Sequence, residues 1–307
     1  MMTEERDSPP LLRENLHALV EGLVAAEGLF VLLDFDGTLA SIESRPDDAT
    51  MPDPTREAIV RLADAPNVEV GVVSGRALAD VRQRLAVDER VAVSDANGDT
   101  HSGESVRERS EIAYAGNHGL ELYADGQRVV HPVARETQGT IEHLCDQLTE
   151  RLLGIDGALV ERKGVTATVH TRLVADEAVP FVSAIVESLA STYDDVRLTT
   201  GKDVLELRPA VAWDKGEAVH WLADEVVPDG EQWFPVYLGD DTTDEAAFAA
   251  LADHDRGFGV KVGSHPPTDA PYRVSDPEAV RQLLSWLAAY GVEFIHADLP
   301  RSPLGIA

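Results

Sequence analysis

The sequence predicts an α/β fold in which a parallel sheet is interrupted by an inserted α+β domain. Short apolar strands alternate with amphipathic helices over residues 11–87, and the same alternation resumes after Pro209. Such alternation is typical of parallel strands joined by right-handed helical crossovers. The stretch between them instead reads as two hairpin-and-helix units. We therefore expect a sheet domain built from residues 1–118 and 209–307, with a second domain inserted at 119–208.

The elements of the sheet domain are predicted from hydrophobic periodicity and turn residues. Asp53-Pro54 opens one helix, as an N-cap residue followed by a proline in the first turn. In the first part we expect a helix at 11–27, a strand at 29–34, a helix at 53–66, a strand at 68–76 and a helix at 77–87. In the second part we expect a helix from Lys215, a strand at 234–241, a helix from Thr243 and a strand at 257–263.

The middle of the chain has a different pattern. Residues 91–111 are polar and rich in Gly and Ser, which predicts an exposed loop. Residues 121–131 contain the Asp-Gly turn of a hairpin, and we assign this hairpin to the inserted domain. The remaining expected elements are a helix near 138–153, paired strands within 159–172, a helix near 177–190 and strands within 196–209.

The charge balance limits the partners of the protein. The chain has 55 acidic residues against 26 lysines and arginines, which gives a formal net charge of −29. Such a surface repels nucleic acid and anionic membranes. No apolar run approaches the roughly 18–20 residues that span a bilayer, and the N-terminus lacks a secretion-signal pattern, so a cytoplasmic protein is expected. The surface also resembles that of salt-adapted (halophilic) proteins, because salt would screen its self-repulsion.

Lysine and cysteine are both scarce. The four lysines are Lys163, Lys202, Lys215 and Lys261. Where surface lysine is avoided, the few that remain are candidates for a function. Cys145 is the single cysteine of the chain. It lies in a helical pattern, so we expect a small buried apolar residue rather than a nucleophile.

Two predicted strands run directly into acidic residues. "VLLDFDGTLA" (31–40) carries Asp34 and Asp36, and "YLGDDTTDE" (237–245) carries Asp240, Asp241 and Asp244. If both strands lie in one parallel sheet, these acids converge at one edge. Clustered carboxylates favour a hard divalent cation, most naturally Mg²⁺. A carboxylate can also attack phosphorus. Thr242 or Thr243 could instead cap the following helix.

Two further motifs suit a phosphate group. "VVSGR" (72–76) offers the Ser74 hydroxyl, with Gly75 and Arg76, at the start of a helix. The same stretch alone would also fit an ordinary turn and helix cap. "WDKG" places Lys215 at another helix start, where a cation opposes the helix dipole. A purely structural role would not favour a lysine there, whereas a phosphate site would.

In this order the four motifs resemble those of haloacid-dehalogenase-superfamily phosphatases. The resemblance implies a Rossmann-like core with an inserted α+β cap, and a reaction through an aspartyl-phosphate. Asp34 would be the nucleophile, and Asp36 the general acid and base. Ser74 and Lys215 would hold the phosphoryl oxygens. The implied Mg²⁺ ligands are Asp34, the backbone carbonyl of Asp36, and Asp240, with Asp241 and Asp244 acting through water or from outside the ligand shell.

Stretches in and beside the inserted domain indicate which sugar phosphate is the substrate. "GNHGLE" (116–121), "ERKGVTATVHTR" (161–172) and "GKDVLELRP" (201–209) are similar to stretches of trehalose-6-phosphate phosphatases, and the resemblance covers about residues 29–285. It implies hydrolysis of trehalose 6-phosphate by a protein whose partner is a small sugar phosphate and which we expect to be a monomer. The implied sugar-binding residues are Asn117, His118, Glu121, Lys163, His170, Arg172, Lys202 and Glu206.

Three alternatives remain open from the sequence. The strand faces in the inserted domain could be solvated surfaces carrying cross-strand ion pairs. The same core could serve another sugar phosphate, such as sucrose phosphate or a glucosyl- or mannosyl-glycerate phosphate. A non-catalytic sugar-phosphate sensor, or a regulatory subunit of a trehalose synthase, is less favoured because Asp34, Asp36, Lys215 and Asp240 are all present.

Overall fold

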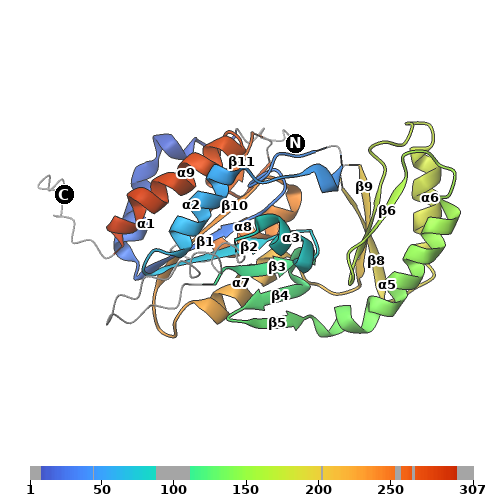
Figure 1. Cartoon of the computed structure of the whole chain (residues 1–307), viewed down its shortest axis with the longest axis horizontal. Coiled ribbons are helices and arrows are strands. Elements are labelled where there is room, and N and C mark those ends of the chain that lie inside the picture. Colours follow the sequence, from blue (N-terminus) through green and yellow to red (C-terminus); the bar gives the residue numbers. More distant parts are fainter. Residues whose placement is uncertain are drawn as a thin grey trace, which may run out of the picture.

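The computed structural model describes residues 8–43, 45–87, 111–201, 203–252, 257–264 and 267–295. The predicted loop at 91–110 and Lys202 lie outside these residues. The described strands form two sheets, which lie at opposite ends of an elongated molecule (Figure 1). The confirmed fold class is α/β with a mainly parallel central sheet. None of the described helices combines the length and the apolar character needed to cross a bilayer.

The large sheet has eight strands in the order β12-β11-β10-β1-β2-β3-β4-β5. Its first six strands in that order pair in parallel, and β4 and β5 are antiparallel. The strands are β1 (Gly28–Leu33), β2 (Val68–Val73), β3 (Ala113–Gly116), β4 (Glu121–Ala124), β5 (Gln127–Val130), β10 (Trp233–Gly239), β11 (Phe258–Val262) and β12 (Tyr272–Val274).

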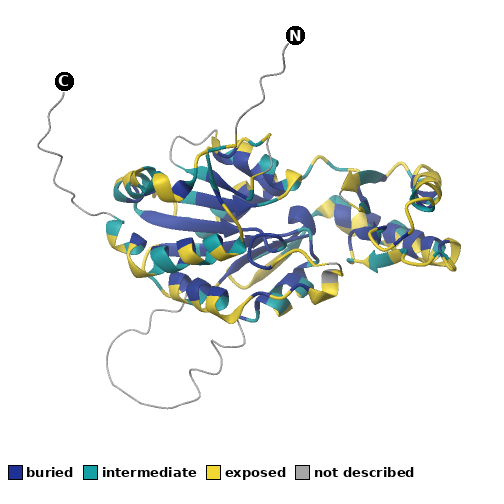
Figure 2. Cartoon of the chain, turned by 90° about the horizontal axis from the view of Figure 1, so that it is seen from above, coloured by how far each residue is buried: buried dark blue, intermediate teal, exposed yellow. Residues whose placement is uncertain are grey.

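Helices cover both faces of the large sheet, as Figure 2 shows. Alternate residues of β1 feed two hydrophobic clusters: Val31 packs with α1, α2, α3 and α9, whereas Phe30 packs with α7 and α8. This explains why β1 is apolar throughout, since a strand covered on both faces has no solvent side. The helices are α1 (Leu16–Ala25), α2 (Asp53–Ala63), α3 (Leu78–Leu85), α7 (Lys215–Val226), α8 (Glu245–Ala252) and α9 (Pro277–Ala289). The 3₁₀ turns are η1 (Leu12–Glu14), η2 (Pro46–Asp48), η3 (Asn117–Gly119), η4 (Thr242–Asp244) and η5 (Gly291–Phe294).

The small sheet has the order β6-β7-β9-β8. Together with two helices it forms the inserted unit, which consists of α5 (Pro132–Arg151), β6 (Leu159–Arg162), β7 (Ala167–His170), α6 (Val179–Ala190), β8 (Val196–Gly201) and β9 (Val204–Pro209). Both helices lie on the side of the small sheet that faces away from the large sheet (Figure 1). Apolar residues such as Val169 and Leu207 face these helices, and Cys145 is buried with them.

The other face of the small sheet is polar. Cross-strand pairing places Glu161, Thr168, Glu206 and Thr199 in one row across the four strands. Because side chains alternate along a strand, this row and the residues two positions away share the face opposite to the helices. The predicted polar strand face is therefore present, and it lies toward the large sheet.

One part of the predicted domain division differs in the structure. We assigned the hairpin at 121–131 to the inserted domain, but β4 and β5 extend the large sheet by pairing with β3. Only the short turn η3 separates β3 from β4. A connection this short reverses the chain into an antiparallel neighbour, since a parallel crossover needs a dozen or more residues. The sheet pairing therefore favours a start of the inserted unit at α5 rather than at residue 119.

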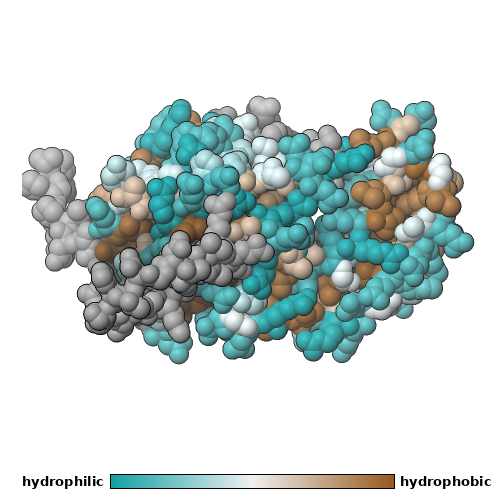
Figure 3. Space-filling view, viewed as in Figure 1, coloured by the Kyte–Doolittle hydropathy of each residue, from teal (hydrophilic) through white to brown (hydrophobic). Residues whose placement is uncertain are grey.

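The outer surfaces of the two parts also differ. Four large exposed hydrophobic side chains belong to the inserted unit, namely Leu153, Leu159, Leu173 and Phe181. Figure 3 shows hydrophobic surface at that end of the molecule, on a face that is otherwise mostly hydrophilic.

Candidate active site

Two carboxylates meet where the central strands of the large sheet end. β1 and β10 are parallel neighbours, and Leu33 is paired with Leu238. The N–H of Asp34 then donates to the carbonyl of Leu238 at 2.9 Å, and Asp240 follows β10 directly. Carboxylate oxygens of Asp34, Asp240 and Asp244 all lie within 4.8 Å of one another. The expected convergence of acids from both ends of the chain is therefore observed for these three residues.

Lys215 lies between two of these acids. Its Nζ is 2.9 Å from Oδ1 of Asp34 and 2.7 Å from Oδ1 of Asp244, and only 2% of the residue is exposed. Asp214 caps α7 by accepting hydrogen bonds from two N–H groups of its first turn. This acidic cap offsets the unfavourable position of a cation at a helix start. The lysine charge is therefore directed at the carboxylates.

Asp244 is fully buried, and both of its oxygens are already used. Oδ1 accepts hydrogen bonds from Lys215 and from the Tyr237 hydroxyl, each at 2.7 Å. Oδ2 accepts from the N–H of Asp241 at 2.9 Å. Asp244 thus holds Lys215 in place. This leaves Asp34 and Asp240 as the carboxylates best placed to bind a further group.

Asp241 points away from this cluster. It is exposed, and its Oδ1 accepts a hydrogen bond from the N–H of Thr242 at 2.7 Å, which caps η4. The sequence suggested Thr242 or Thr243 as the cap, but the cap is Asp241. The reason is that its carboxylate stands immediately before the free N–H groups of η4. Its predicted contribution to a metal site, through water or from outside the ligand shell, stays a prediction.

Burial changes the protonation of the cluster. Burial raises the pKa of Asp34 well above its ordinary value, although the Lys215 charge opposes this. Burial, reinforced by the charge of Asp244, raises the pKa of Asp240 to about 7. Burial alone would lower the pKa of Lys215, but the carboxylates of Asp244 and Asp34 outweigh it and raise that pKa. The lysine is therefore firmly cationic, whereas the two carboxylates lack enough positive charge nearby.

The geometry fits a divalent cation. Oδ1 of Asp240 is buried and has no hydrogen-bond partner among the described residues. Gly37 has φ of +78° and lies so close that a Cβ there would be 2.1 Å from Oδ2 of Asp240. Carboxylate oxygens are the ligands that Mg²⁺ prefers, and a bound cation would counteract the effect of burial on the pKa of Asp34. The donor set therefore suits a hard cation held by Asp34 and Asp240.

Asp36 is held by Arg76 beside this cluster. Nε and Nη2 of Arg76 each donate to one oxygen of Asp36 at 2.7 Å, and Nη1 donates to Asp80 at 2.8 Å. Such a two-fold contact is among the strongest pairings of a carboxylate. The sequence predicted Arg76 as a substrate ligand. In this structure its guanidinium binds Asp36, and its predicted role stays a prediction.

The turn after β2 brings the two parts of the molecule together. Ser74 is buried, and its Oγ accepts from the N–H of Arg76 at 3.2 Å. Gly75 allows the ring of His118 to approach, because a Cβ on Gly75 would be 2.8 Å from that ring. The carbonyl of Gly75 accepts a hydrogen bond at 3.2 Å from Nζ of Lys163, in the inserted unit.

His118 forms a second link. Its Nε2 is 3.2 Å from Oε1 of Glu206. Burial alone would raise the pKa of Glu206, but the proximity of His118 lowers it to about 2. Glu206 is therefore a carboxylate that can only accept, so Nε2 must carry the hydrogen. Burial lowers the pKa of His118, with Glu206 opposing the shift.

Two predicted sugar ligands, Asn117 and Glu121, make hydrogen bonds within the protein. The Nδ2 of Asn117 donates to Glu121 at 2.7 Å and to the carbonyl of Lys163 at 2.9 Å, and its Oδ1 accepts from Thr166 at 2.7 Å. Glu121 also accepts from Arg128 at 2.6 Å. Because these groups are already satisfied within the protein, the structure does not favour Asn117 and Glu121 as sugar ligands.

His170 and Arg172 make different contacts. The ring of His170 is 2.7 Å from Glu161. Burial alone would raise the pKa of Glu161, but the hydrogen bond from His170 and the charges of Lys163 and Arg76 lower it. Arg172 donates to the carbonyl of Glu43, in the loop after β1. Arg172 therefore connects the inserted unit to the large-sheet part. Lys202, another predicted sugar ligand, lies outside the described residues.

Sequence reasoning missed Thr168, at the centre of the polar row. It is 3% exposed, and its hydroxyl has no hydrogen-bond partner among the described residues. It stands between Glu161 and Glu206 in the cross-strand register. The period-two pattern that placed His170 on this face also includes Thr168, so the signal was present.

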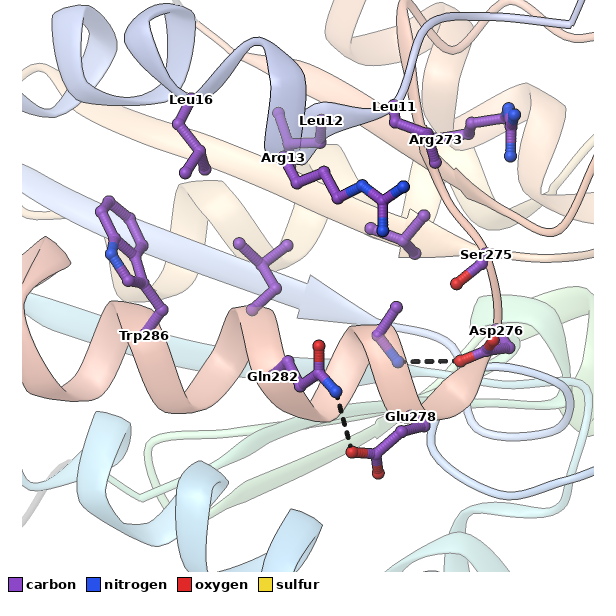
Figure 4. Close-up of a pocket in the computed structure, with 13 residues that line it drawn as sticks. Leu11, Leu12, Arg13, Leu16, Arg273, Ser275, Asp276, Glu278, Gln282 and Trp286 are labelled. Atoms are coloured by element: carbon purple, nitrogen blue, oxygen red, sulfur yellow. Dashed lines mark hydrogen bonds between the residues drawn. The ribbon is translucent and has the colours of Figure 1, made fainter.

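A separate cavity of about 480 Å³ lies between η1 and α9. Figure 4 shows two hydrogen bonds at the start of α9: Asp276, its N-cap, accepts from the N–H of Ala279, and Gln282 donates to Glu278. None of the predicted site residues lines this cavity. The candidate active site is therefore the edge of the large sheet that faces the inserted unit.

The fold and this set of side chains agree with the haloacid dehalogenase superfamily, to which the chain belongs through its match to a family model. The comparison with family models is more specific. The model described as trehalose-phosphatase matches residues 32–98 and 83–278. The chain belongs to the trehalose-phosphatase family.

The chain is also similar to individual proteins and to a solved structure. Trehalose-phosphate phosphatase B of Arabidopsis thaliana is 33% identical over 279 residues, which cover 87% of this chain and 68% of that protein. An uncharacterized glycosyl hydrolase of Mycobacterium tuberculosis (strain ATCC 25618 / H37Rv) is 38% identical over 294 residues, but the chain spans only 20% of its length. The C-terminal domain of a C. albicans trehalose-6-phosphate phosphatase shares the fold, with a TM-score of 0.69 at 23% identity, covering 92% of this chain and 99% of that one.

Proposed function

We propose that the protein is a Mg²⁺-dependent phosphatase that hydrolyses trehalose 6-phosphate to trehalose and phosphate through an aspartyl-phosphate. The observation that carries this proposal is the arrangement of Asp34, Asp240 and Lys215 at one sheet edge. Membership of the trehalose-phosphatase family supports the substrate. The inserted unit, from α5 to β9, would act as the cap over the sugar.

In the first step, a carboxylate oxygen of Asp34 attacks the phosphorus while the bond from phosphorus to the sugar oxygen breaks. Asp36 gives its proton to the departing sugar oxygen. Lys215 stabilises negative charge on the phosphoryl group, and Asp244 keeps its ammonium group in position. A bound Mg²⁺, held by Asp34 and Asp240, would supply further neutralising charge.

In the second step, Asp36 takes a proton from water, and the resulting hydroxide attacks the phosphorus of the aspartyl-phosphate. Phosphate leaves, and the Asp34 carboxylate is restored. Asp36 cannot donate a proton while both its oxygens accept from Arg76. An entering phosphate that takes over Arg76 would free Asp36. The proton that Asp36 gives in the first step then comes from solvent in the first turnover and, in later turnovers, from the water of the second step.

The polar face of the inserted unit supports recognition of sugar hydroxyls. Glu206, held ionised by its surroundings, and the hydroxyl of Thr168, which has no hydrogen-bond partner in the described part of the chain, face the same region. Buried groups of this kind discriminate strongly between substrates, because an ill-fitting sugar leaves them unpaired.

A substrate panel tests the proposal. Phosphate release should be measured with Mg²⁺ for trehalose 6-phosphate, sucrose 6-phosphate, glucose 6-phosphate and glucosylglycerate phosphate, with 4-nitrophenyl phosphate as a minimal substrate. We expect kcat/KM for trehalose 6-phosphate to exceed that of the other sugars by at least about 100-fold. Comparable values would refute this substrate. Binding of the sugar phosphate without any turnover would indicate a sensor instead.

A further inference from the structure

Lys261 is a buried lysine that the reaction described above does not use. It is one of only four lysines in the chain, and 4% of it is exposed. It lies on β11 in register with Gly239, the residue immediately before Asp240. A buried lysine in a lysine-poor chain requires an explanation from its contacts.

The Lys261 ammonium group lies beneath the segment that carries the acids. Its Nζ donates to the backbone carbonyl of Asp241 at 3.1 Å and to Oε1 of Glu245 at 2.9 Å. Oε2 of Glu245 accepts in turn from the hydroxyl of Thr268 at 3.0 Å and from the N–H of Asp269 at 2.8 Å. Lys261 thus joins both ends of segment 241–245 to the neighbouring strand and to the loop after it.

Asp240 depends on this support. Oδ1 of Asp240 has no hydrogen-bond partner among the described residues, so its direction follows from the path of the backbone at 240–241. Asp244 fixes one side of that segment through Lys215 and Tyr237. The tie from Lys261 to the carbonyl of Asp241 fixes the residue next to Asp240.

We propose that Lys261 is a positioning residue of the cation site, which aims the Asp240 carboxylate at the space shared with Asp34. This inference rests on the metal site of the proposed function and deepens it. Groups that orient metal ligands from outside the ligand shell typically change metal affinity or activity by about 10–100-fold when they are removed.

Calorimetric titration of the substrate-free protein with Mg²⁺ tests this role without relying on turnover. We expect K261M to raise the Mg²⁺ dissociation constant by about tenfold or more. K261R keeps the charge and its donors, and it should restore most of the affinity. The matched control R281M removes a cation from an ion pair on α9, far along the chain from this segment, and should bind Mg²⁺ like the unaltered protein. At saturating Mg²⁺ the KM for trehalose 6-phosphate should be unchanged in all of them.

The outcomes separate the inference from the proposed function. A folded K261M with unaltered Mg²⁺ affinity would overturn the role of Lys261 and leave the proposed function intact. If the unaltered protein binds no Mg²⁺, both the metal part of the proposed function and this inference fail. Should K261M not fold, the variant K261M/E245Q removes the partly buried carboxylate that would have lost its lysine partner. It should show the same loss of affinity, and unaltered affinity there would also overturn the inference.

Discussion

The edge of the large sheet and the polar face of the inserted unit are organised in different ways. At the sheet edge, Lys215, Asp34 and Asp244 are almost completely buried, and Nζ of Lys215 lies within 3 Å of an oxygen of each acid. At the polar face, His118 from η3 contacts Glu206, and His170 contacts Glu161; these four side chains keep between 10% and 28% of their surface exposed. The charged groups of the sheet edge are thus already paired with one another, and under the proposed function the polar face would add hydrogen bonds to a sugar. Variants at the two places should therefore fail in different ways.

The largest effect is expected for Asp34→Asn. A neutral amide is a far weaker nucleophile than a carboxylate, so turnover should fall by about 10⁴-fold or more. The loss should be equal for trehalose 6-phosphate and 4-nitrophenyl phosphate, because both require the same attack. The exposed Asp229→Asn serves as the matched control and should keep full activity. Near-normal phosphate release by Asp34→Asn would exclude Asp34 as the attacking group.

Removing Mg²⁺ should also stop both reactions. Chelation followed by dialysis should abolish phosphate release from either substrate, since the carboxylates would again lack neutralising charge. Adding Mg²⁺ back should restore the rate. A chelated protein that works at full rate would contradict the metal assignment.

Lys215→Met and Lys163→Met compare a lysine at the edge of the large sheet with a lysine of the inserted unit. The first leaves two buried carboxylates facing each other, so the free energy of unfolding should fall by about 3–5 kcal/mol. The second loses one hydrogen bond to the carbonyl of Gly75 and a 3.8 Å ion pair with Glu161, so the fall should be about 1 kcal/mol. Urea denaturation at neutral pH measures both values. Equal losses would mean that the two places are not organised as differently as we describe.

Glu206→Gln should separate recognition from chemistry. Loss of a charged hydrogen-bond acceptor should raise the KM for trehalose 6-phosphate by about 10–100-fold. The rate with 4-nitrophenyl phosphate, which has no sugar, should stay the same. Glu187→Gln, an exposed position on α6, is the control. A parallel loss on both substrates would place Glu206 in the chemistry rather than in sugar recognition.

Salt should have the smallest effect and act on the surface of both parts. With a net charge of −29, molar KCl should raise the melting temperature by several degrees through screening. The ratio of kcat/KM for the two substrates should change little. A melting temperature that does not respond to salt would remove the expectation of salt adaptation.

The sheet edge could be predicted because its logic is local and repetitive. An apolar strand that ends on an acidic residue can be recognised in the sequence. Parallel pairing of two such strands then brings Asp34 and Asp240 to the same edge of the sheet. The hairpin at 121–130 was placed in the wrong unit, because strand patterns do not say which sheet a strand joins. Arg76 pairs with Asp36, and Asp241 caps η4. Both contacts depend on the directions of side chains, which cannot be predicted from the spacing of residues in the sequence.

The sugar-facing residues were the hardest to predict. Asn117 and Glu121 belong to the motif GNHGLE (116–121), but their side chains already form hydrogen bonds within the protein. The scarcity of lysine marks Lys261 as a candidate functional residue. Its contacts with segment 241–245 depend on the pairing of β11 with β10, which the sequence does not specify.

A crystal structure of the protein with Mn²⁺ in place of Mg²⁺, together with beryllium fluoride as a phosphoryl mimic, tests the central claim most directly. Anomalous scattering should locate one ion bound by oxygens of both Asp34 and Asp240, with the beryllium fluoride attached to Asp34. An ion bound elsewhere, or a mimic attached to another residue, would contradict the account.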